Sequence, residues 1–210
     1  ERTVRPVYKV KQDEQALSAT LVQSPSTPVI LPGCIAGESL LSQIIVDKFL
    51  YHLPEYRQAK RFKELGVEIT TSSINRWVHV MADKLYGLYA AQMERVLSAG
   101  YIQVDETTHP ITDRPGSARK GYIWVVRSVL FPGVFFYYDK GSRSQEVVLK
   151  MLKGYQGALQ TDGYAAYSIF EEKKGVLPLG CMAHVRRKFE HALTTTPEAK
   201  PALDYIALLY

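Results

Sequence analysis

The sequence predicts an α/β protein in which a helical region precedes a mixed sheet with the element order β-β-β-α-β-α-β-α. Between residues 38 and 99, apolar residues recur every three or four positions, which is the period of amphipathic helices. After Gly100 the pattern changes to short runs rich in β-branched and aromatic residues, separated by turn signals. The 210 residues are 46% hydrophobic and 22% charged, which excludes disordered and fibrous classes and suffices for one large or two small cores.

Residues 1–37 are expected to form an extended N-terminal segment. Polar and apolar side chains alternate over residues 3–11, a pattern typical of an edge strand that tolerates Pro6. A connector rich in serine and proline follows at residues 24–28, and Leu31-Pro32-Gly33 adds a further turn signal.

Three helices are expected in the helical domain over residues 38–99. The first opens the domain, and the second covers residues 54–65, with Gly66 as its stop. The third has Thr71 or Ser72 as its N-cap and continues to the end of the domain.

The sheet domain expected over residues 100–182 begins with an antiparallel meander of three strands, at residues 101–105, 122–130 and 134–138. A helix follows, opened by Ser142-x-x-Gln145 in the manner of a capping box and closed at Gly154. Two further strands are expected at residues 158–161 and 176–179. A helix then opens the last segment, residues 183–210.

Charge and cysteine content restrict the setting. Lys and Arg number 26 against 21 Asp and Glu, a net charge of +5 that suits a polyanionic partner but is also common without one. Two cysteines far apart, Cys34 and Cys181, favour a reducing compartment and no disulfide. No apolar run is long enough for a membrane span or a signal peptide, so we expect no membrane partner and an intracellular, soluble protein. The chain starts without methionine and ends within an apparent helix, and is therefore expected to be an internal piece of a longer protein.

Asp105 and Asp162 are the residues expected to bind metal. Each follows an apolar strand, and taken singly each is also explained as a turn-former. If the two strands are parallel neighbours joined by the helix between them, both carboxylates emerge at the same end of the sheet, about 5 Å apart. Paired carboxylates repel when ionised and favour Mg²⁺ or Mn²⁺ as a bridging ion.

A second set of polar residues lies on the helix after the fifth strand. Cys181 and His184 form a CxxH pair, which supplies too few ligands for zinc, and we expect no zinc in this protein. Arg186, Arg187 and Lys188 follow and suit DNA phosphates, with solvated helix charge as the equal alternative.

The second and third expected helices have the layout of a helix-turn-helix motif. If they bind DNA, the residues predicted to face the groove are Ser73, Asn75, Arg76 and His79. Those predicted to meet phosphates are Arg57, Lys60, Arg61 and Lys63. Three-helix bundles that bind no nucleic acid share this layout, so DNA contact stays open.

Several motifs in their order make the sequence similar to the IS66 family of bacterial transposases. They are Leu53-Pro54-Glu55-Tyr56-Arg57-Gln58, Leu65-Gly66-Val67, Ile74-x-x-Trp77-Val78, Val104-Asp105-Glu106-Thr107, Leu159-Gln160-Thr161-Asp162-Gly163-Tyr164-Ala165-Ala166-Tyr167 and Cys181-Met182-Ala183-His184-Val185-Arg186-Arg187-Lys188-Phe189. The resemblance implies a ribonuclease-H-like catalytic domain that cuts and joins DNA with Mg²⁺ and a DDE triad.

The resemblance assigns Asp105 and Asp162 as the first two triad members. It places His184 near the scissile phosphate, with a helix-start histidine satisfied by backbone as the alternative. The glutamate of the family lies in an Asn-x-x-Glu type motif beyond a helical insertion, and this sequence contains no such motif. We therefore expect the third carboxylate beyond residue 210; Glu198, at a spacing other DDE families use, and Glu190 are weaker choices. Where family members often carry a cysteine-rich zinc segment, this chain has residues 7–13 without cysteine.

Three functions follow from these observations. The first is a piece of a DNA transposase, a bacterial cytoplasmic and nucleoid-associated protein that acts on transposon ends and target DNA as a multimer. The alternative is a helix-turn-helix DNA-binding module with a non-catalytic sheet domain. The third is a nuclease or phosphatase on the same sheet.

Overall fold

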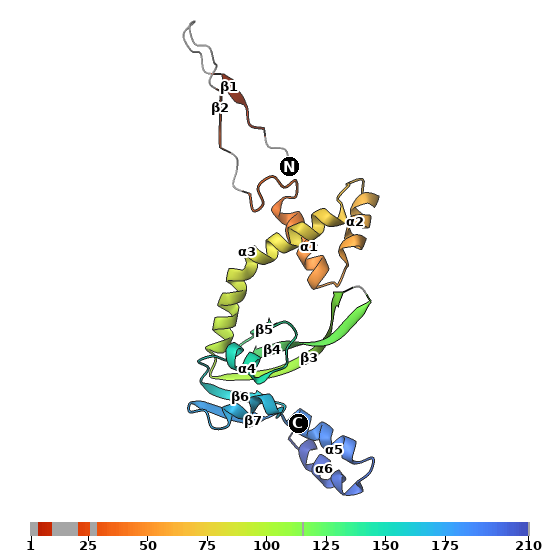
Figure 1. Cartoon of the computed structure of the whole chain (residues 1–210), viewed down its shortest axis with the longest axis vertical. Helices are drawn as coiled ribbons and strands as arrows, with labels where there is room; N and C mark the ends of the chain where they lie inside the picture. The colour runs from red at the N-terminus through yellow and green to blue at the C-terminus, as the bar shows by residue number, and fades with distance from the viewer. Residues whose placement is uncertain (1–3, 10–20, 26–28, 115, 210) are drawn as a thin grey trace. The chain divides into compact units, whose positions relative to one another are not determined.

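The computed structural model of the chain describes residues 4–9, 21–25, 29–114 and 116–209 (Figure 1). The chain divides into two compact units, Glu1–Lys84 and Leu85–Tyr210, and the division lies inside one long helix. We call them the helical unit and the sheet unit, and describe each by itself.

Three helices make up most of the helical unit: α1 (Glu38–Phe49), α2 (Glu55–Glu64) and the first half of α3 (Thr71–Leu97). Their apolar faces share one core, since the spacing of three and four places these side chains on one side of each helix. Its buried members are Leu31, Ala36, Leu41, Ile44, Phe62, Ile69, Ile74, Trp77, Val78 and Met81. Gly66, with φ of +80°, ends the α2 segment as expected.

Polar contacts between helices add to this core. Asp47 is 4% exposed and pairs with Arg61, and the amide of the fully buried Gln58 donates to the carbonyl oxygens of Ile44 and Leu53. Glu55 joins α1 to α3 by accepting hydrogen bonds from Lys48 at 2.7 Å and Asn75 at 3.0 Å. Burial raises the pKa of Glu55, but the hydrogen bonds from Lys48 and Asn75 outweigh it and leave the pKa below its ordinary value.

A small two-stranded sheet precedes these helices. β1 (Val7–Lys9) pairs antiparallel with β2 (Leu21–Gln23), and all six residues are exposed. Of the strand expected over residues 3–11, only β1 is observed: residues 4–6 are described but form no strand, and residues 3, 10 and 11 lie outside the described residues. The second strand was not expected. Residues 26–28 of the Ser/Pro-rich connector also lie outside the described residues.

Five strands form the sheet of the sheet unit, in the order β5-β4-β3-β6-β7. The strands are β3 (Tyr101–Arg114), β4 (Ser117–Ser128), β5 (Val134–Tyr137), β6 (Gly157–Thr161) and β7 (Val176–Gly180). The first three form the expected antiparallel meander, and β6 runs parallel to both β3 and β7. The protein is thus a mixed α/β structure.

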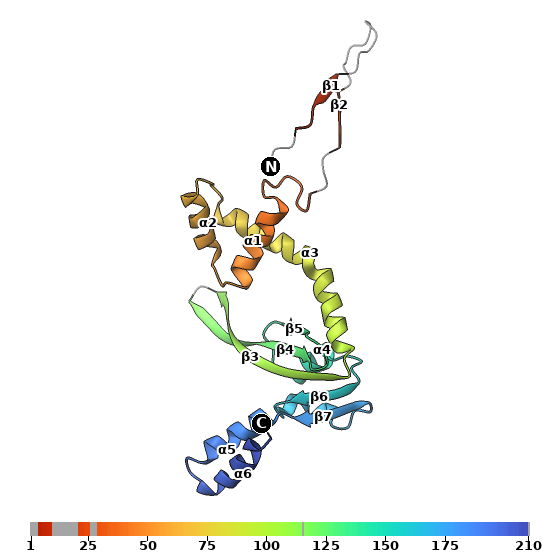
Figure 2. The same cartoon turned by 180° about the vertical axis from the view of Figure 1, so that it is seen from behind.

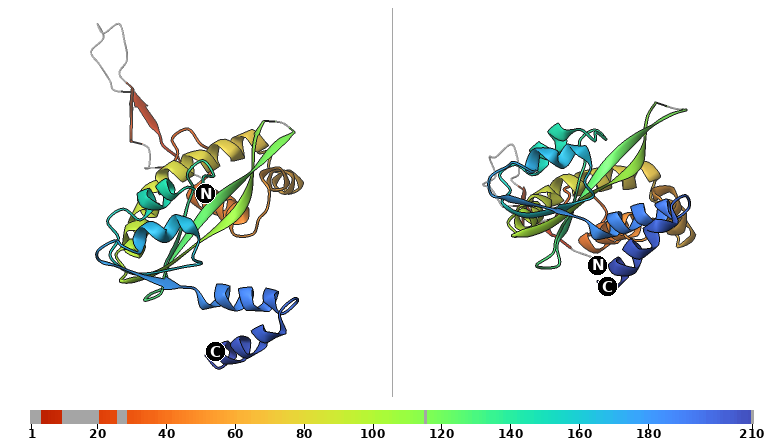
Figure 3. Two further views of the ribbon diagram at one scale, coloured as in Figure 1. Left: turned by 60° about the horizontal axis from the view of Figure 1, so that its bottom comes forward. Right: turned by 90° about the horizontal axis from the view of Figure 1, so that it is seen from below.

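The hairpin of β3 and β4 corrects the prediction for this region. β3 was expected to end at Asp105, and β4 to begin at Tyr122, but the two strands continue as a pair to Arg114 and Ser117 (Figure 3). Beyond Thr107 the hairpin pairs with no other strand and its described side chains are largely exposed. No buried face forms there, so the residues lack the apolar alternation by which a strand is recognised.

The core of the sheet unit lies on one face of the sheet. Alternate residues of β3 and β4, among them Ile102, Val104, Trp124 and Val126, point into it. It is covered by the last turns of α3, by α4 (Gln145–Met151) and by the 3-10 helix η1 (Ala165–Phe170). Residues 85–97 of α3 therefore pack with the sheet, and Tyr89 donates a hydrogen bond to the carbonyl oxygen of Phe136.

The start of α4 differs from the expected capping box. The N-cap is Ser144, not Ser142, and no side chain caps the helix. Ser142 instead accepts the backbone N–H of Ser144 at 3.2 Å, because the carbonyl oxygen of Ser142 is held by the indole of Trp124. The loop is therefore arranged around a buried tryptophan rather than by local capping.

Two helices follow β7, namely α5 (Met182–Ala192) and α6 (Lys200–Ala207), with the 3-10 turn η2 (Pro197–Ala199) between them. They pack on each other (Figure 2). None of the helices in the described part of the chain combines the length and the apolar character needed to cross a membrane.

Candidate functional site

Three side chains with metal-binding chemistry meet at one end of the sheet. Asp105 lies in β3, Asp162 follows β6 directly, and His184 lies in the first turn of α5. One ligand atom from each residue lies within 4.8 Å of those of the other two. The structure thus brings together the three residues to which the sequence analysis assigned catalytic roles.

Local geometry explains why these side chains converge. β3 and β6 are parallel neighbours, so the residues that follow their paired segments lie at the same edge. The backbone N–H of Cys181 donates to the carbonyl oxygen of Thr161 at 2.8 Å, which brings the start of α5 beside Asp162. Asp105 was expected to end its strand, but it does not, because β3 continues in the hairpin with β4.

Each aspartate uses one carboxylate oxygen locally. Oδ1 of Asp105 accepts the N–H of Glu106 at 2.9 Å, and Oδ1 of Asp162 accepts the N–H of Tyr164 at 2.8 Å. These bonds orient the carboxylates and use one lone pair each, so both groups keep oxygens for a ligand. The Nδ1 atom of His184 is buried and has no hydrogen-bond partner among the described residues.

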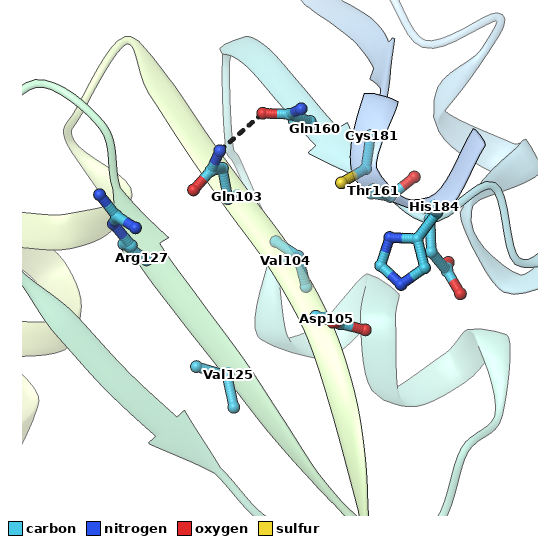
Figure 4. Close-up of a pocket in the computed structure, with 10 residues that line it drawn as sticks. Gln103, Val104, Asp105, Val125, Arg127, Gln160, Thr161, Cys181 and His184 are labelled. Atoms are coloured by element: carbon cyan, nitrogen blue, oxygen red, sulfur yellow. Dashed lines mark hydrogen bonds between the residues drawn. The ribbon is translucent and has the colours of Figure 1, made fainter. Parts of the chain in front are cut away.

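The carboxylates open into a cavity of about 220 Å³ on the face of the sheet opposite the core (Figure 4). Its wall includes Gln103, whose amide donates to Oε1 of Gln160 at 2.7 Å, and Arg127. Cys181 also lines the cavity, but it is not part of the cluster of ligand atoms.

A second hollow, of about 410 Å³, shares Asp162 and His184 with the first. Tyr164 also lines it, together with Arg187, Lys188 and His191 of α5. Arg186 does not line it, and its guanidinium instead pairs with Glu190 at 2.7 Å. Only two of the three cations predicted on this helix therefore lie beside the carboxylates.

The donor set of the cluster fits a hard divalent cation. Mg²⁺ typically binds through one or two carboxylates and completes its coordination with water and substrate phosphates. Asp105 and Asp162 supply those carboxylates, and the adjoining cavity leaves room for the other ligands. The cluster includes no glutamate; Glu190 is paired with Arg186, and Glu198 lies in η2.

The DNA contacts predicted in the helical unit have different surroundings. Three of the side chains are engaged within the protein: Arg61 with Asp47, Ser73 with Thr70 and Asn75 with Glu55. The other predicted contacts include Arg57, which stacks on Tyr56, Lys60, which lies 3.9 Å from Glu64, and Arg76, which lines a cavity beside Trp77. These last three are exposed.

Sequence reasoning missed a buried charge next to Asp105. The side chain of Glu106 is 2% exposed and pairs with Arg143. A signal was present, because Glu106 follows Val104 by two positions in a strand and so points to the same, buried face. A carboxylate there requires a partner, but the sequence does not say which cation supplies it.

The family of the chain is shown by comparison with known proteins. The model of the family described as "Transposase IS66 family" matches residues 33–210. The chain belongs to the IS66 transposase family. Three relatives from Sinorhizobium fredii are each called an uncharacterized protein. This IS66 chain is 31% identical to y4jD over 100% of its own length and 43% of the relative, and 30% identical to y4qI over 80% and 34%. It is 32% identical to y4hP over 89% and 35%. The IS66 chain thus spans less than half the length of these relatives.

Proposed function

We propose that this protein is the part of a DNA transposase that carries two of the three carboxylates of a DDE site, Asp105 and Asp162. The observation that carries the proposal is their convergence, with His184, within 4.8 Å beside the parallel pair of strands β3 and β6, in a chain of the IS66 family. The mixed sheet with both carboxylates at one edge supports a ribonuclease-H-like catalytic core. The proposed location is the bacterial cytoplasm, in association with the nucleoid.

Asp105 and Asp162 are the residues that would hold Mg²⁺ or Mn²⁺. When bound, such ions activate an attacking hydroxyl and stabilise the leaving oxygen of a phosphodiester. The hydrogen bonds from the N–H groups of Glu106 and Tyr164 orient the two carboxylates that would hold the ion. His184 is assigned to the substrate rather than to the metal, because Mg²⁺ prefers oxygen ligands and the imidazole can donate a hydrogen bond to a phosphate oxygen.

The hollow beside the carboxylates supports a path for the DNA backbone. Arg187 and Lys188 carry positive charge along the wall that starts at Asp162 and His184. A phosphate next to the scissile one would lie against these cations, which neutralise it. In the helical unit, the exposed Arg57, Lys60 and Arg76 are the remaining proposed DNA contacts. The active form is proposed to be a multimer that holds transposon ends and target together.

The third carboxylate is proposed to lie outside residues 1–210. Neither Glu190 nor Glu198 belongs to the cluster formed by the described residues. The chain of 210 residues is therefore expected to bind DNA without cutting it. Metal-dependent cleavage by this chain that Asp105→Asn abolishes would show instead that it contains a complete site.

The decisive experiment compares Asp105→Asn with the wild type in the full-length transposase. We expect the variant to lose Mg²⁺-dependent strand transfer while DNA affinity, measured by fluorescence anisotropy, stays within about twofold. Unchanged strand transfer would favour the alternative, a helix-turn-helix DNA-binding module whose sheet unit is not catalytic. Cleavage without joining of ends would favour a nuclease.

A further inference from the structure

The backbone pairing between β3 and β6 ends before it reaches the aspartates. The paired residues are Tyr101 with Ala158, Ile102 with Leu159 and Gln103 with Gln160. Asp105 and Asp162 each lie two residues beyond the last pair, so this ladder does not fix the distance between them. Without a cation, two ionised carboxylates at this distance also repel each other. Another interaction must hold the two segments together.

Such an interaction lies on the opposite face of the sheet. Glu106, the neighbour of Asp105, points into the core side and is 2% exposed. Its Oε1 accepts Nε–H of Arg143 at 2.6 Å, and its Oε2 accepts the hydroxyl of Tyr167 at 3.1 Å. Both partners come from segments other than β3: Arg143 from the loop before α4 and Tyr167 from η1.

The same arginine contacts the turn that carries Asp162. The guanidinium of Arg143 lies 3.7 Å from the ring centroid of Tyr164, whose hydroxyl donates to the carbonyl oxygen of Arg143 at 3.4 Å. Tyr164 in turn donates its backbone N–H to Asp162. A continuous series of contacts therefore runs from the residue beside Asp105, through Arg143, to the carboxylate of Asp162.

Two of the three side chains Glu106, Arg143 and Tyr167 are buried, with Glu106 2% and Tyr167 5% exposed. Burial raises the pKa of Tyr167, and the charge of Glu106 raises it further, so the hydroxyl stays protonated and remains a donor. Burial lowers the pKa of Arg143, but its bonds with Glu106 outweigh this and raise the pKa overall. The rings of Tyr167 and Trp124 also pack in a T-shaped arrangement, with centroids 6.1 Å apart. Removing any one partner leaves a buried polar group without its bond.

We propose that Glu106, Arg143 and Tyr167 act as positioning residues that hold Asp105 and Asp162 at metal-binding distance. We call this set the cross-brace. The inference rests on the proposed function, since it concerns the same carboxylates. Residues that orient metal ligands typically change metal affinity by 10- to 100-fold when they are replaced.

The test is a Mn²⁺ titration of the 210-residue chain, in which water-proton relaxation reports the bound ion. It is carried out at a temperature where circular dichroism shows that every variant is folded. Tyr167→Phe keeps the ring and its packing on Trp124 but removes the hydroxyl, and Glu106→Gln keeps the shape but removes the charge. We expect each to weaken Mn²⁺ binding by about tenfold. If Glu106→Gln does not fold, Tyr167→Phe still decides the matter.

Asp47→Asn is the matched control, because Asp47 is also a buried carboxylate paired with an arginine but lies in the helical unit. It should lower thermal stability and leave Mn²⁺ affinity unchanged, which separates positioning from general destabilisation. Asp105→Asn separates the two proposals. If it loses Mn²⁺ binding while Tyr167→Phe and Glu106→Gln bind as the wild type does, the cross-brace is refuted. If Asp105→Asn binds Mn²⁺ as the wild type does, the metal site itself is refuted.

Discussion

Replacing Asp105 by asparagine should make the metal-free protein more stable. Asparagine keeps an oxygen that can accept the N–H of Glu106, so the local hydrogen bond survives. It removes one of two negative charges that lie close together at the edge of the sheet. The repulsion between Asp105 and Asp162 destabilises the folded state only, because the unfolded chain holds the two residues far apart.

The size of this effect follows from the distance. At 4.8 Å, the limit of separation within the cluster, two unit charges repel by about 0.9 kcal/mol in bulk water and by about 3.5 kcal/mol at an effective dielectric constant of about 20. Asp105 is exposed and Asp162 is half-buried, so screening by solvent favours the lower part of this range. We expect Asp105→Asn to raise the free energy of unfolding by about 1 to 2 kcal/mol, or Tm by about 3–8 °C.

The assay is thermal unfolding of the sheet unit by calorimetry, first in EDTA and then with increasing Mn²⁺. In the wild type, Mn²⁺ at ten times its Kd should add about 1.4 kcal/mol of stability, since ligand binding to the folded state shifts the equilibrium. Asp105→Asn should gain little from the same Mn²⁺. Glu172→Gln removes an exposed negative charge of the same unit and serves as the control.

Two results would refute this reasoning. A lower Tm for Asp105→Asn in EDTA would mean that the carboxylate makes a stabilising contact larger than the repulsion. An equal response of wild type and variant to Mn²⁺ would mean that the ion binds elsewhere.

Three further predictions concern the strand pairing, the helical unit and the DNA path. Gly157→Ala should destabilise the sheet unit by about 2 kcal/mol or more, because φ is +128° at this position and the new Cβ would lie 2.5 Å from the carbonyl oxygen of Gly100. Thermal unfolding measures this, and a change under about 0.5 kcal/mol would contradict it. Because the pKa of Glu55 is lowered, its ionised carboxylate stabilises the helical unit fully at pH values above the ordinary pKa of 4.5, and progressively less as the pH falls through the lowered pKa. Glu55→Gln should therefore raise the rate of amide hydrogen exchange in α2 near neutral pH and differ less from the wild type in acid. Arg187→Gln should weaken DNA binding, measured by fluorescence anisotropy, and lower the slope of log K against log salt concentration by about 1. Arg186→Gln breaks only an ion pair within α5 and should change that slope less. Equal effects of the two substitutions would exclude the DNA path beside Asp162.

The sequence alone predicts the elements whose signals are local. Apolar side chains at helical spacing predict α1, α2 and α3, because one face of each helix must be buried. The meander and the helix that leads to β6 follow from short apolar runs and turn signals. The parallel pairing of β3 with β6 was the condition on which the metal site was predicted, and the structure has it. The approach of Asp105 to Asp162 was expected on that condition, but the β3–β6 ladder ends two residues before each aspartate, so the topology alone does not fix their distance.

Features without a buried face could not be predicted in this way. The outer part of the β3–β4 hairpin and β2 are exposed on their described residues, so selection for burial leaves no period in the sequence. β1 is the exception, because it lies in the alternating stretch that predicted a strand. The hydrogen bond between Asn75 and Glu55 depends on how α2 meets α3 rather than on either helix.

The division between local and tertiary information is clearest next to the proposed metal site. The alternation of β3 determines that Asp105 and Glu106 point to opposite faces, one toward the cavity and one toward the core. Only the tertiary structure decides which groups bind the buried carboxylate of Glu106. Arg143 and Tyr167 are 37 and 61 residues away along the chain, and they become its neighbours when α4 and η1 pack on the sheet. A strand pattern specifies which way a side chain points, whereas its partner is specified by the packing of the whole unit.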